Sequence, residues 1–379
     1  MKFILSSTEL LSHLQAISRV INSKNSLPIL DNFLFDLKGK TLTMTASDIE
    51  TTLITSMEVE NSEGDGKVAV ASKLLLDTLR EFSEQPLSFT INDSNLAMVI
   101  SSANGTYNFI GQNGDEYPRM PQLNDEARVL NLSVDQLSAG ISKTLFCTAD
   151  DELRPVMNGV FFDIEKESLT MVATDAHKLV RYKTNHSSIT MGDEEERVSF
   201  ILPKKPATML KNILPKESGE VEVRFDSKNA HFKLSNYTMI CRQVEGKYPN
   251  YNGVIPKQNS YKIIIDRLSI LNALKRVSVF SNQASNLVKL DFNANLLNIS
   301  AQDIDFSISA EETINCQFEG DPIKIGFKSS FLVEILGNIS SAEVILEVSD
   351  PSRAGLILPL ENEDNEEILM LLMPMLLND

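Results

Sequence analysis

The 379-residue sequence contains no tryptophan, four histidines and three cysteines, and these scarcities exclude whole classes of protein. The cysteines, Cys147, Cys241 and Cys316, lie far apart and are odd in number, so they predict neither a disulfide framework nor a zinc site. Such cysteine usage is typical of a reducing compartment. No apolar run is long enough for a signal peptide or a membrane span, and the longest, 368–377, is interrupted by Pro374. We therefore expect a cytoplasmic protein.

Local signatures of catalysis are also missing. The sequence has no phosphate-binding loop, no paired-histidine zinc helix, no serine elbow and no dinucleotide-binding glycine fingerprint. His177 lies shortly after Asp175, which leaves open a hydrolase built from dispersed carboxylates around this histidine. Because no second histidine or nucleophile lies nearby in the sequence, we favour a non-enzyme with no catalytic residue, no metal and no cofactor.

What the sequence does contain is an internal threefold repeat. An aliphatic strand leads into a helix start three times, at 3–11, 129–137 and 261–268. An alternating strand that ends in aspartate also recurs, at Asp48, Asp175 and Asp303. Ser6 with Glu9, Ser133 with Gln136, and Asp266 are the expected helix caps. We predict an α+β protein made of three tandem domains, 1–122, 123–254 and 255–379, each with two helices and antiparallel sheets.

The charge is distributed unevenly along this repeat. The chain has 35 basic and 52 acidic residues and a net charge of −17, which argues at first against a nucleic-acid partner. The six expected helical segments nevertheless sum to +7 and leave −24 elsewhere, for example in 193–196 and 361–367. These segments are 7–24, 72–82, 133–147, 203–216, 266–280 and 328–338. Helices that share one surface would make it positive, as a sequence-independent contact with a polyanion requires; the alternative is that they carry idle, solvated lysines.

Four short segments, taken with the repeat, resemble the bacterial DNA polymerase III beta subunit, the sliding-clamp family. They are 27–32 (LPILDN), 172–179 (VATDAHKL), 244–251 (VEGKYPNY) and 373–375 (MPM). The resemblance implies a head-to-tail homodimer that closes into a ring with helices inside and sheets outside. Double-stranded DNA would pass through the ring regardless of its sequence, and the ring would tether a polymerase. Topological linkage would then replace tight binding, so weak phosphate contacts suffice.

The resemblance also implies DNA contacts. It places basic residues at Lys24 and Arg154. On the expected helices we add the phosphate-facing candidates Lys73, Arg80, Lys204, Lys205, Lys211, Lys275, Arg276 and Lys328. Each of these residues could instead be solvated and idle, so the set is a stronger prediction than any of its members.

A partner-binding cleft between the second and third domains is implied as well. In the family it receives a short linear motif from the polymerase III catalytic subunit, the clamp loader and other partners. The matching positions are Met157, Thr174, Ala176, His177, Lys178, Leu179, Pro249, Val254, Met373, Pro374, Met375, Leu376 and Leu377. Methionine suits a cleft that accepts several ligands, because it is flexible and polarizable. The alternative is that 368–373 is a buried edge strand followed by a frayed end; we expect strand in the first half and cleft in the second.

The sequence departs from the family at several of these positions. Ala176 stands where glycine is common, Gly253 where arginine is frequent, and Leu376 where a basic residue often lies. Asn378 and Asp379 extend beyond the usual end. We expect these departures to shift the preference toward more apolar motifs.

The resemblance implies a subunit interface too. Tyr107 and Phe109 are expected on an edge strand of the first domain, and Val279 and Phe280 at the end of a helix of the third. The family pairs these regions across subunits, which would give a closed heterologous interface. The alternative is that all four residues belong to the cores of their own domains. An acidic scaffold that binds only proteins also remains open as a function.

Overall fold

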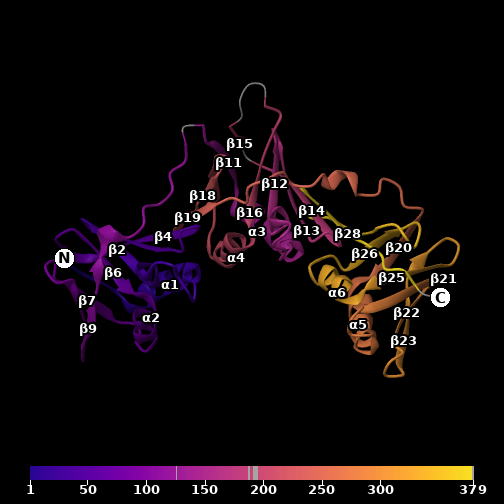
Figure 1. Ribbon diagram of the computed structural model, residues 1–379, viewed down its shortest axis with the longest axis horizontal. Helices are drawn as coiled ribbons and strands as arrows, with labels where there is room; N and C mark the ends of the chain where they lie inside the picture. Colours follow the sequence, from indigo (N-terminus) through magenta and orange to yellow (C-terminus); the bar gives the residue numbers. More distant parts are fainter. Residues whose placement is uncertain (125, 187, 191–194, 378–379) are drawn as a thin grey trace. The chain divides into compact units, whose positions relative to one another are not determined.

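The computed structural model describes residues 1–124, 126–186, 188–190 and 195–377 (Figure 1). The described chain forms two compact units. Unit 1 contains 1–124, 126–137, 188–190 and 208–243, and unit 2 contains 138–186, 195–207 and 244–377. Asp193 and Glu194 of the acidic run, and the terminal Asn378 and Asp379, lie outside the described residues. The predicted domain boundaries at 122 and 254 stay a prediction.

All six predicted helices are confirmed. They are α1 (Ser7–Ile17), α2 (Ser72–Arg80), α3 (Val134–Thr144), α4 (Lys204–Ile213), α5 (Arg267–Val277) and α6 (Ser329–Gly337). Helix α1 buries Leu10, Leu14 and Ile17 on one face, as their spacing requires. Among the described residues, no helix is long and apolar enough to cross a bilayer.

The helix caps form as expected. Ser133 and Gln136 satisfy each other's backbone N–H groups through their side chains, at 3.0 and 3.1 Å. Ser6 Oγ accepts the N–H of Glu9, and Asp266 accepts the N–H of Ser269 at 2.7 Å. These caps hold each helix at the end of the strand that precedes it.

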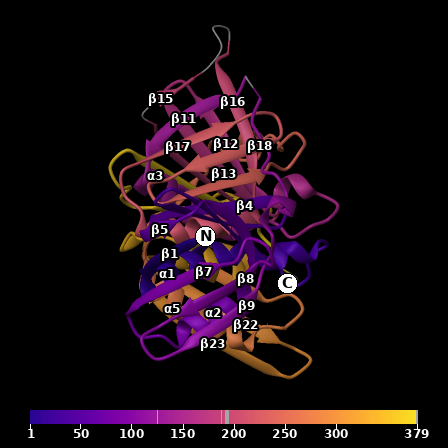
Figure 2. The same cartoon turned by 90° about the vertical axis from the view of Figure 1, so that its left-hand side faces the viewer.

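Unit 1 contains two antiparallel sheets (Figure 2). The five-stranded sheet has the order β5 (Glu60–Glu63), β1 (Lys2–Ser6), β7 (Pro86–Ile91), β8 (Ala97–Ser101), β9 (Thr106–Ile110). The ten-stranded sheet has the order β10 (Gln112–Asn113), β6 (Gly66–Ala71), β2 (Asn32–Lys38), β3 (Thr41–Ser47), β4 (Thr51–Glu58), β19 (Tyr237–Arg242), β18 (Asn229–Lys233), β17 (Glu220–Phe225), β11 (Arg128–Ser133), β15 (Ser188–Ile189). The pairing of β4 with β19 joins the first repeat to the second, and we name it the unit 1 junction.

Unit 2 repeats this plan (Figure 1). Its nine-stranded sheet has the order β16 (Arg197–Pro203), β12 (Gly159–Glu165), β13 (Ser168–Thr174), β14 (Lys178–Asn185), β28 (Glu366–Leu372), β27 (Gly355–Pro359), β26 (Glu343–Val348), β20 (Tyr261–Asp266), β24 (Gln317–Phe318). Its four-stranded sheet has the order β23 (Ile308–Asn315), β22 (Leu296–Asp303), β21 (Leu287–Asn293), β25 (Ile323–Lys328). The pairing of β14 with β28 joins the second repeat to the third and is the unit 2 junction. Because β28 pairs on both sides, the alternative of an edge strand at 368–373 is wrong.

The three recurring aspartates are turn residues. Asp48 accepts the N–H of Thr51, and Asp175 accepts those of His177 and Lys178, each within 2.9 Å. Asp303 accepts the N–H of Asp305 at 3.0 Å. Each carboxylate therefore closes the turn after β3, β13 or β22, as expected of an aspartate that folds back on its own backbone.

The core lies between helices and sheets in each unit. In unit 2, α5 and α6 bury Leu274 and Ile335 against strands that contribute Leu290, Ile299 and Leu346. This layering leaves the opposite face of the helices available to carry polar and charged side chains.

Candidate functional site

The turn between β13 and β14 is built by hydrogen bonds to short side chains. Thr174 Oγ1 donates to the carbonyl of Lys178 at 2.7 Å and accepts the N–H of Ala176 at 3.1 Å. Ala176 has φ +74°, a left-handed conformation that glycine adopts without steric cost. The family's frequent glycine at this position therefore has a conformational reason.

Lys178 follows this turn and is buried, with 5 % of its surface exposed. Its ammonium lies 2.8 Å from Asp175 Oδ2 and 3.2 Å from Glu334 Oε2 on α6. Burial by itself lowers the pKa of Lys178, but the hydrogen bond with Asp175 and the nearby carboxylates hold that pKa above its ordinary value. Burial likewise opposes, but does not cancel, the hydrogen bonds that lower the pKa of Asp175. Lys178 thus differs from a solvent-exposed pocket residue.

An apolar cluster covers one face of the unit 2 junction. It brings Leu179 of β14 together with Leu371 of β28 and with Tyr248 and Tyr251 of the segment 244–254. The Tyr251 hydroxyl donates to Asp163 of β12 at 2.6 Å, which anchors this segment on the sheet. Leu179 is one of the predicted cleft residues and forms part of the buried floor.

The C-terminal tail, 373–377, lies beside the turn and the four-stranded sheet. The Met373 N–H donates to the His177 carbonyl at 2.9 Å, and the Met375 N–H donates to the Gly326 carbonyl of β25 at 2.8 Å. Met373 is 43 % and Leu376 is 80 % exposed. We group the exposed predicted residues His177, Val254, Met373 and Leu376 with the half-buried ones, Met157, Pro249, Pro374, Met375 and Leu377, and call this set the tail surface.

Sequence reasoning missed several members of this region. Tyr248, Tyr251 and Leu371 belong to the apolar cluster that contains Leu179, and Glu334 of the third repeat pairs with Lys178. The tyrosines lie within the segment 244–251 that carried the resemblance, so that segment contained a usable signal. The sequence contained no signal for Glu334, because its partner Lys178 lies far away in the sequence.

A cavity of about 470 Å³ lies on the four-stranded sheet next to the tail. Strands β21, β22 and β23 line it together with Leu377 and Ile304. None of the other predicted cleft residues, all of which the structure describes, lines it. The tail surface and this cavity therefore meet at Leu377.

The predicted DNA-facing cations fall into three groups. Four of them form ion pairs: Arg80 with Asp77, Arg154 with Asp151, Lys204 with Asp150, and Arg276 with Glu312. The hydrogen bond from Arg276 lowers the pKa of Glu312, and that from Arg154 lowers the pKa of Asp151, so these carboxylates stay charged. Four others are exposed and form no ion pair within the described chain: Lys24, Lys73, Lys211 and Lys275.

Two further cations are partly buried. Lys205 lies half-buried in the first turn of α4. Lys328 precedes α6, and its ammonium lies 4.6 Å from the centre of the Phe331 ring. Arg267, which contributes to the charge sum, donates to the carbonyls of Ser341 and Leu336 and is a structural residue.

The four predicted interface residues occupy different environments. Tyr107 and Phe109 do lie on β9, the outer strand of the five-stranded sheet. Phe109 is only 6 % exposed and belongs to the core, whereas Tyr107, two residues earlier on the same face of the strand, is 38 % exposed. Val279 (73 %) and Phe280 (38 %) follow α5 in a short 3-10 turn and face solvent. The core alternative therefore describes Phe109 alone.

His177 does not have the environment of a catalytic histidine. Its backbone N–H bonds to Asp175, and its ring lies 6.1 Å from that of Phe331. Within the described chain no group of three or more His, Cys, Asp or Glu could hold a metal ion.

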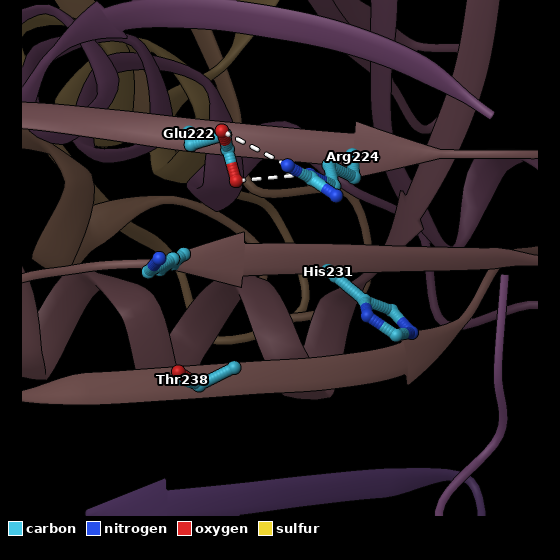
Figure 3. A pocket seen from close by; sticks show the side chains of 5 residues that line it. Glu222, Arg224, His231 and Thr238 are labelled. Carbon is cyan, nitrogen blue, oxygen red and sulfur yellow. Dashed lines mark hydrogen bonds and ion pairs between the residues drawn. The ribbon is translucent and has the colours of Figure 1, made fainter.

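A second histidine, His231, lines a cavity of about 220 Å³ on β17, β18 and β19 (Figure 3). The neighbouring Glu222 is held by Arg224 at 2.9 Å. Burial lowers the pKa of His231. The only hydroxyl among the lining residues is that of Thr238, so the arrangement does not resemble a nucleophile with its base.

Comparison with known proteins covers nearly the whole chain. Residues 1–121, 131–250 and 252–375 match the N-terminal, central and C-terminal domains of the DNA polymerase III beta subunit. The beta sliding clamp of Vibrio cholerae is 26 % identical over 374 residues, which cover 99 % of each chain. The beta sliding clamp of Pseudomonas putida is 25 % identical over 370 residues, covering 98 % of this chain and 99 % of the relative.

Solved structures agree with these matches. A sliding clamp (DNA polymerase III subunit beta) from Bartonella birtlesii bound to griselimycin is 27 % identical, with a TM-score of 0.91 and full coverage of both chains. A DNA polymerase III subunit beta from Pseudomonas aeruginosa, 24 % identical, has the same fold with a TM-score of 0.92 over the full length of both chains. The three tandem α+β domains are therefore clamp domains, and the chain belongs to the DNA polymerase III beta-subunit family of sliding clamps, non-catalytic processivity factors of DNA replication.

Proposed function

We propose that two copies of this chain form a head-to-tail ring around duplex DNA and hold the replicative polymerase on it. The observation that carries the proposal is a pair of open sheet edges. In unit 1, the outer strand β4 of the β3–β4 hairpin of the first repeat pairs with β19 of the second repeat. In unit 2, the outer strand β14 of the β13–β14 hairpin pairs with β28 of the third repeat. The third hairpin, β22–β23, leaves β23 at the edge of its sheet.

The missing partner of β23 has an equivalent at the other end of the chain. Strand β9 ends the β7–β8–β9 meander of the first repeat, as β19 and β28 end the β17–β18–β19 and β26–β27–β28 meanders. In the described chain β9 pairs only with β8. Pairing β23 of one copy with β9 of the other continues the repeat, and two such contacts close a two-chain ring.

The side chains near both edges support this pairing. Ile110 (79 %) and Tyr107 are exposed on β9, while Val279 and Phe280 are exposed beside the β22–β23 hairpin. Burying them against a second copy would remove apolar area from water at about 25 cal/mol per Å². Phe109 would take part through its backbone, because its side chain already fills the core.

Sedimentation velocity tests the ring. At micromolar concentration the native chain should sediment as a dimer. Val279→Glu with Phe280→Glu should give monomers, because two charges would be buried in the seam. The matched control is Leu153→Glu, a change at a 93 % exposed residue outside the seam, which should stay dimeric. A native chain that is monomeric, or a double variant that stays dimeric, would contradict the proposed seam.

The exposed lysines support contact with DNA phosphates. Lys24, Lys73, Lys211 and Lys275 can approach a phosphate without first leaving a carboxylate. The paired cations would first have to leave their carboxylate partner before they could bind a phosphate. They are Arg80, Arg154, Lys204 and Arg276. We propose that the four exposed lysines supply most of the salt-dependent contact, with Lys205 and Lys328 as additional candidates.

Salt titration of DNA binding separates the two groups. Changing the four exposed lysines to glutamine should flatten the plot of log affinity against log salt, by about 0.9 for each phosphate that is no longer neutralised. Changing Arg80, Arg154 and Arg276 to glutamine should flatten it less. A scaffold that binds only proteins would tolerate both sets, and that outcome would refute DNA encirclement.

We also propose that the tail surface binds a short segment of the polymerase III catalytic subunit, the clamp loader and other partners. Exposed Met373 and Leu376 follow strand β28, whose Leu371 belongs to the buried apolar cluster, and flexible apolar side chains of this kind suit an adaptable peptide contact. The Bartonella birtlesii clamp binds griselimycin, and we propose the tail surface as its site in this chain. Within this proposal the three domains are 1–122, 123–254 and 255–379, acting in the cytoplasm without a cofactor.

Deleting residues 373–379 tests the tail surface. Fluorescence anisotropy with a labelled polymerase segment that carries the clamp-binding motif should show binding to the native chain and none to the deletion variant. Griselimycin should compete with the segment. Equal affinity of both chains would refute the assignment, and the dimer seen in sedimentation would show that the deletion variant still folds.

A further inference from the structure

Lys178 is more deeply buried than any other lysine or arginine in the described part of the chain. A buried ammonium is costly unless carboxylates and hydrogen bonds offset its desolvation. Lys178 has two carboxylates within 3.2 Å, from Asp175 in its own turn and from Glu334 on α6. Its ammonium also lies 4.8 Å from the centre of the Phe331 ring on α6. The side chain is thus fully engaged by protein groups.

These contacts join two parts of unit 2 that lie far apart in the sequence. Asp175 is fixed to its own turn by the N–H groups of His177 and Lys178. Glu334 belongs to α6 of the third repeat. Lys178 therefore fastens the β13–β14 turn to α6, and the Phe331 ring lies beside both Lys178 and His177.

The same turn supports the C-terminal tail. The His177 carbonyl accepts the N–H of Met373 at 2.9 Å, where the tail leaves β28. A shift of the turn would move this carbonyl and with it the start of the tail. A continuous set of contacts thus runs from α6 through Lys178 and the turn to Met373.

We infer that Lys178 is a positioning residue of the tail surface: it sets the place of the turn and the tail, and it does not contact the bound partner. This inference rests on the proposed binding of a polymerase segment at the tail surface. It changes the role of Lys178 from a residue that lines the cleft, as the resemblance implies, to a support held between Asp175 and Glu334.

A double-mutant cycle tests the inference with the labelled polymerase segment. Lys178→Met should weaken binding about 10-fold, and Glu334→Gln several-fold, because each releases the turn from α6. The double variant should bind no more weakly than Lys178→Met, since both changes break one link. Lys178→Arg should retain most of the affinity. Lys183→Met, on the same strand, is the matched control and should bind like the native chain.

Stability measurements separate positioning from unfolding. Removing one member of a buried ion pair leaves the partner charge uncompensated and usually destabilises the fold, so the unfolding free energy of Lys178→Met is measured beside its binding. Glu334 is 40 % exposed, so Glu334→Gln tests the link even if Lys178→Met folds poorly. Hydrogen exchange at residues 174–178 and 373–375 should speed up in both variants.

Three outcomes would overturn the inference. Lys178→Met could bind like the native chain, or the two single effects could multiply in the double variant. Alternatively, neutralising an acidic residue of the segment could weaken binding to the native chain but not to Lys178→Met, which would show direct contact. If instead the native chain fails to bind the segment, or binds it equally well without residues 373–379, the proposed tail surface itself is refuted and the inference falls with it.

Discussion

The two junctions within the chain share one design, and we propose a partner surface at only one of them. At the unit 1 junction, β4 pairs antiparallel with β19; at the unit 2 junction, β14 pairs antiparallel with β28. At each junction, the residue just before the first paired residue of β4 or β14 lies in a turn. Its carbonyl accepts the N–H of the residue that comes directly after the last paired residue of β19 or β28. These pairs are Glu50 with Arg242 and His177 with Met373, at 2.8 and 2.9 Å.

The side chains at these equivalent positions differ in kind. Glu50 and Arg242 are both more than half exposed and form an ion pair at 3.5 Å, which leaves charges at the surface of the unit 1 junction. His177 and Met373 present an aromatic ring and a thioether instead. The register position of Lys178 is occupied in unit 1 by Thr51, which is buried and bonded to Asp48.

This difference indicates which features of unit 2 would form the proposed partner surface. The repeated hairpin and meander are common to both junctions, so they do not create it. The additions specific to unit 2 do: the tail after β28, the anchored segment 244–254, and the Lys178 link to α6. The proposed partner surface would thus be an addition to a junction whose strand pairing is common to both units.

The largest effect should come from displacing the tail while leaving the junction intact. A Cβ at Gly326 would lie 2.7 Å from the Met375 carbonyl and 2.8 Å from Leu377 Cδ2. Gly326→Val should therefore weaken binding of the polymerase segment at least 30-fold in fluorescence anisotropy. Gly337→Ala, whose Cβ has open space, is the control and should bind normally. Normal binding by Gly326→Val would mean that the tail's place does not matter.

A smaller effect is expected from the left-handed residues of the two turns. Ile49 (φ +80°) and Ala176 (φ +74°) hold equivalent positions. A left-handed non-glycine residue costs about 1–2 kcal/mol; glycine removes this cost, but its greater freedom in the unfolded chain offsets part of the gain. Native-state hydrogen exchange should show a gain of about 1 kcal/mol for Ile49→Gly and about 0.5 kcal/mol for Ala176→Gly. A loss in either variant would show that the side chain, rather than the backbone, governs that turn.

Much of this comparison is readable from the sequence. Helix periodicity, capping residues and the recurring aspartates predict all six helices and the turn after each of β3, β13 and β22, because these features depend on local spacing. The tertiary partners are not local. Glu334 beside Lys178 and Glu312 beside Arg276 become visible only when distant elements meet, whereas Asp77 lies three residues before Arg80 on the same helix. The burial of Phe109 depends on strand register, and a shift of one residue would have exposed it.

The smallest expected difference between the two units is in how their stability depends on pH. Burial lowers the pKa of His13, which contacts Thr55 of β4 at 2.6 Å, and also that of His231; both lie in unit 1. A lowered folded-state pKa means that the unfolded imidazole takes up its proton first. The stability from these groups is therefore present above the ordinary value of 6.5 and is lost as the pH falls below it.

Unit 2 provides the comparison for that experiment. The pKa of Asp175 is lowered, so its contribution persists until the pH falls below the ordinary value of 3.8. Between pH 6.5 and pH 5, hydrogen exchange should speed up at the unit 1 junction more than in the turn 174–178. His13→Asn should reduce the difference, and equal acceleration in both regions would contradict the assignment.

The central claim, that the chain encircles DNA, is tested most directly by topology. The chain is loaded by its clamp loader onto a nicked circular plasmid, separated by gel filtration, and the plasmid is then cut once. The account predicts that the protein stays on the circle and runs off the linear DNA. Equal retention on circular and linear DNA would contradict encirclement and indicate ordinary binding to the duplex surface.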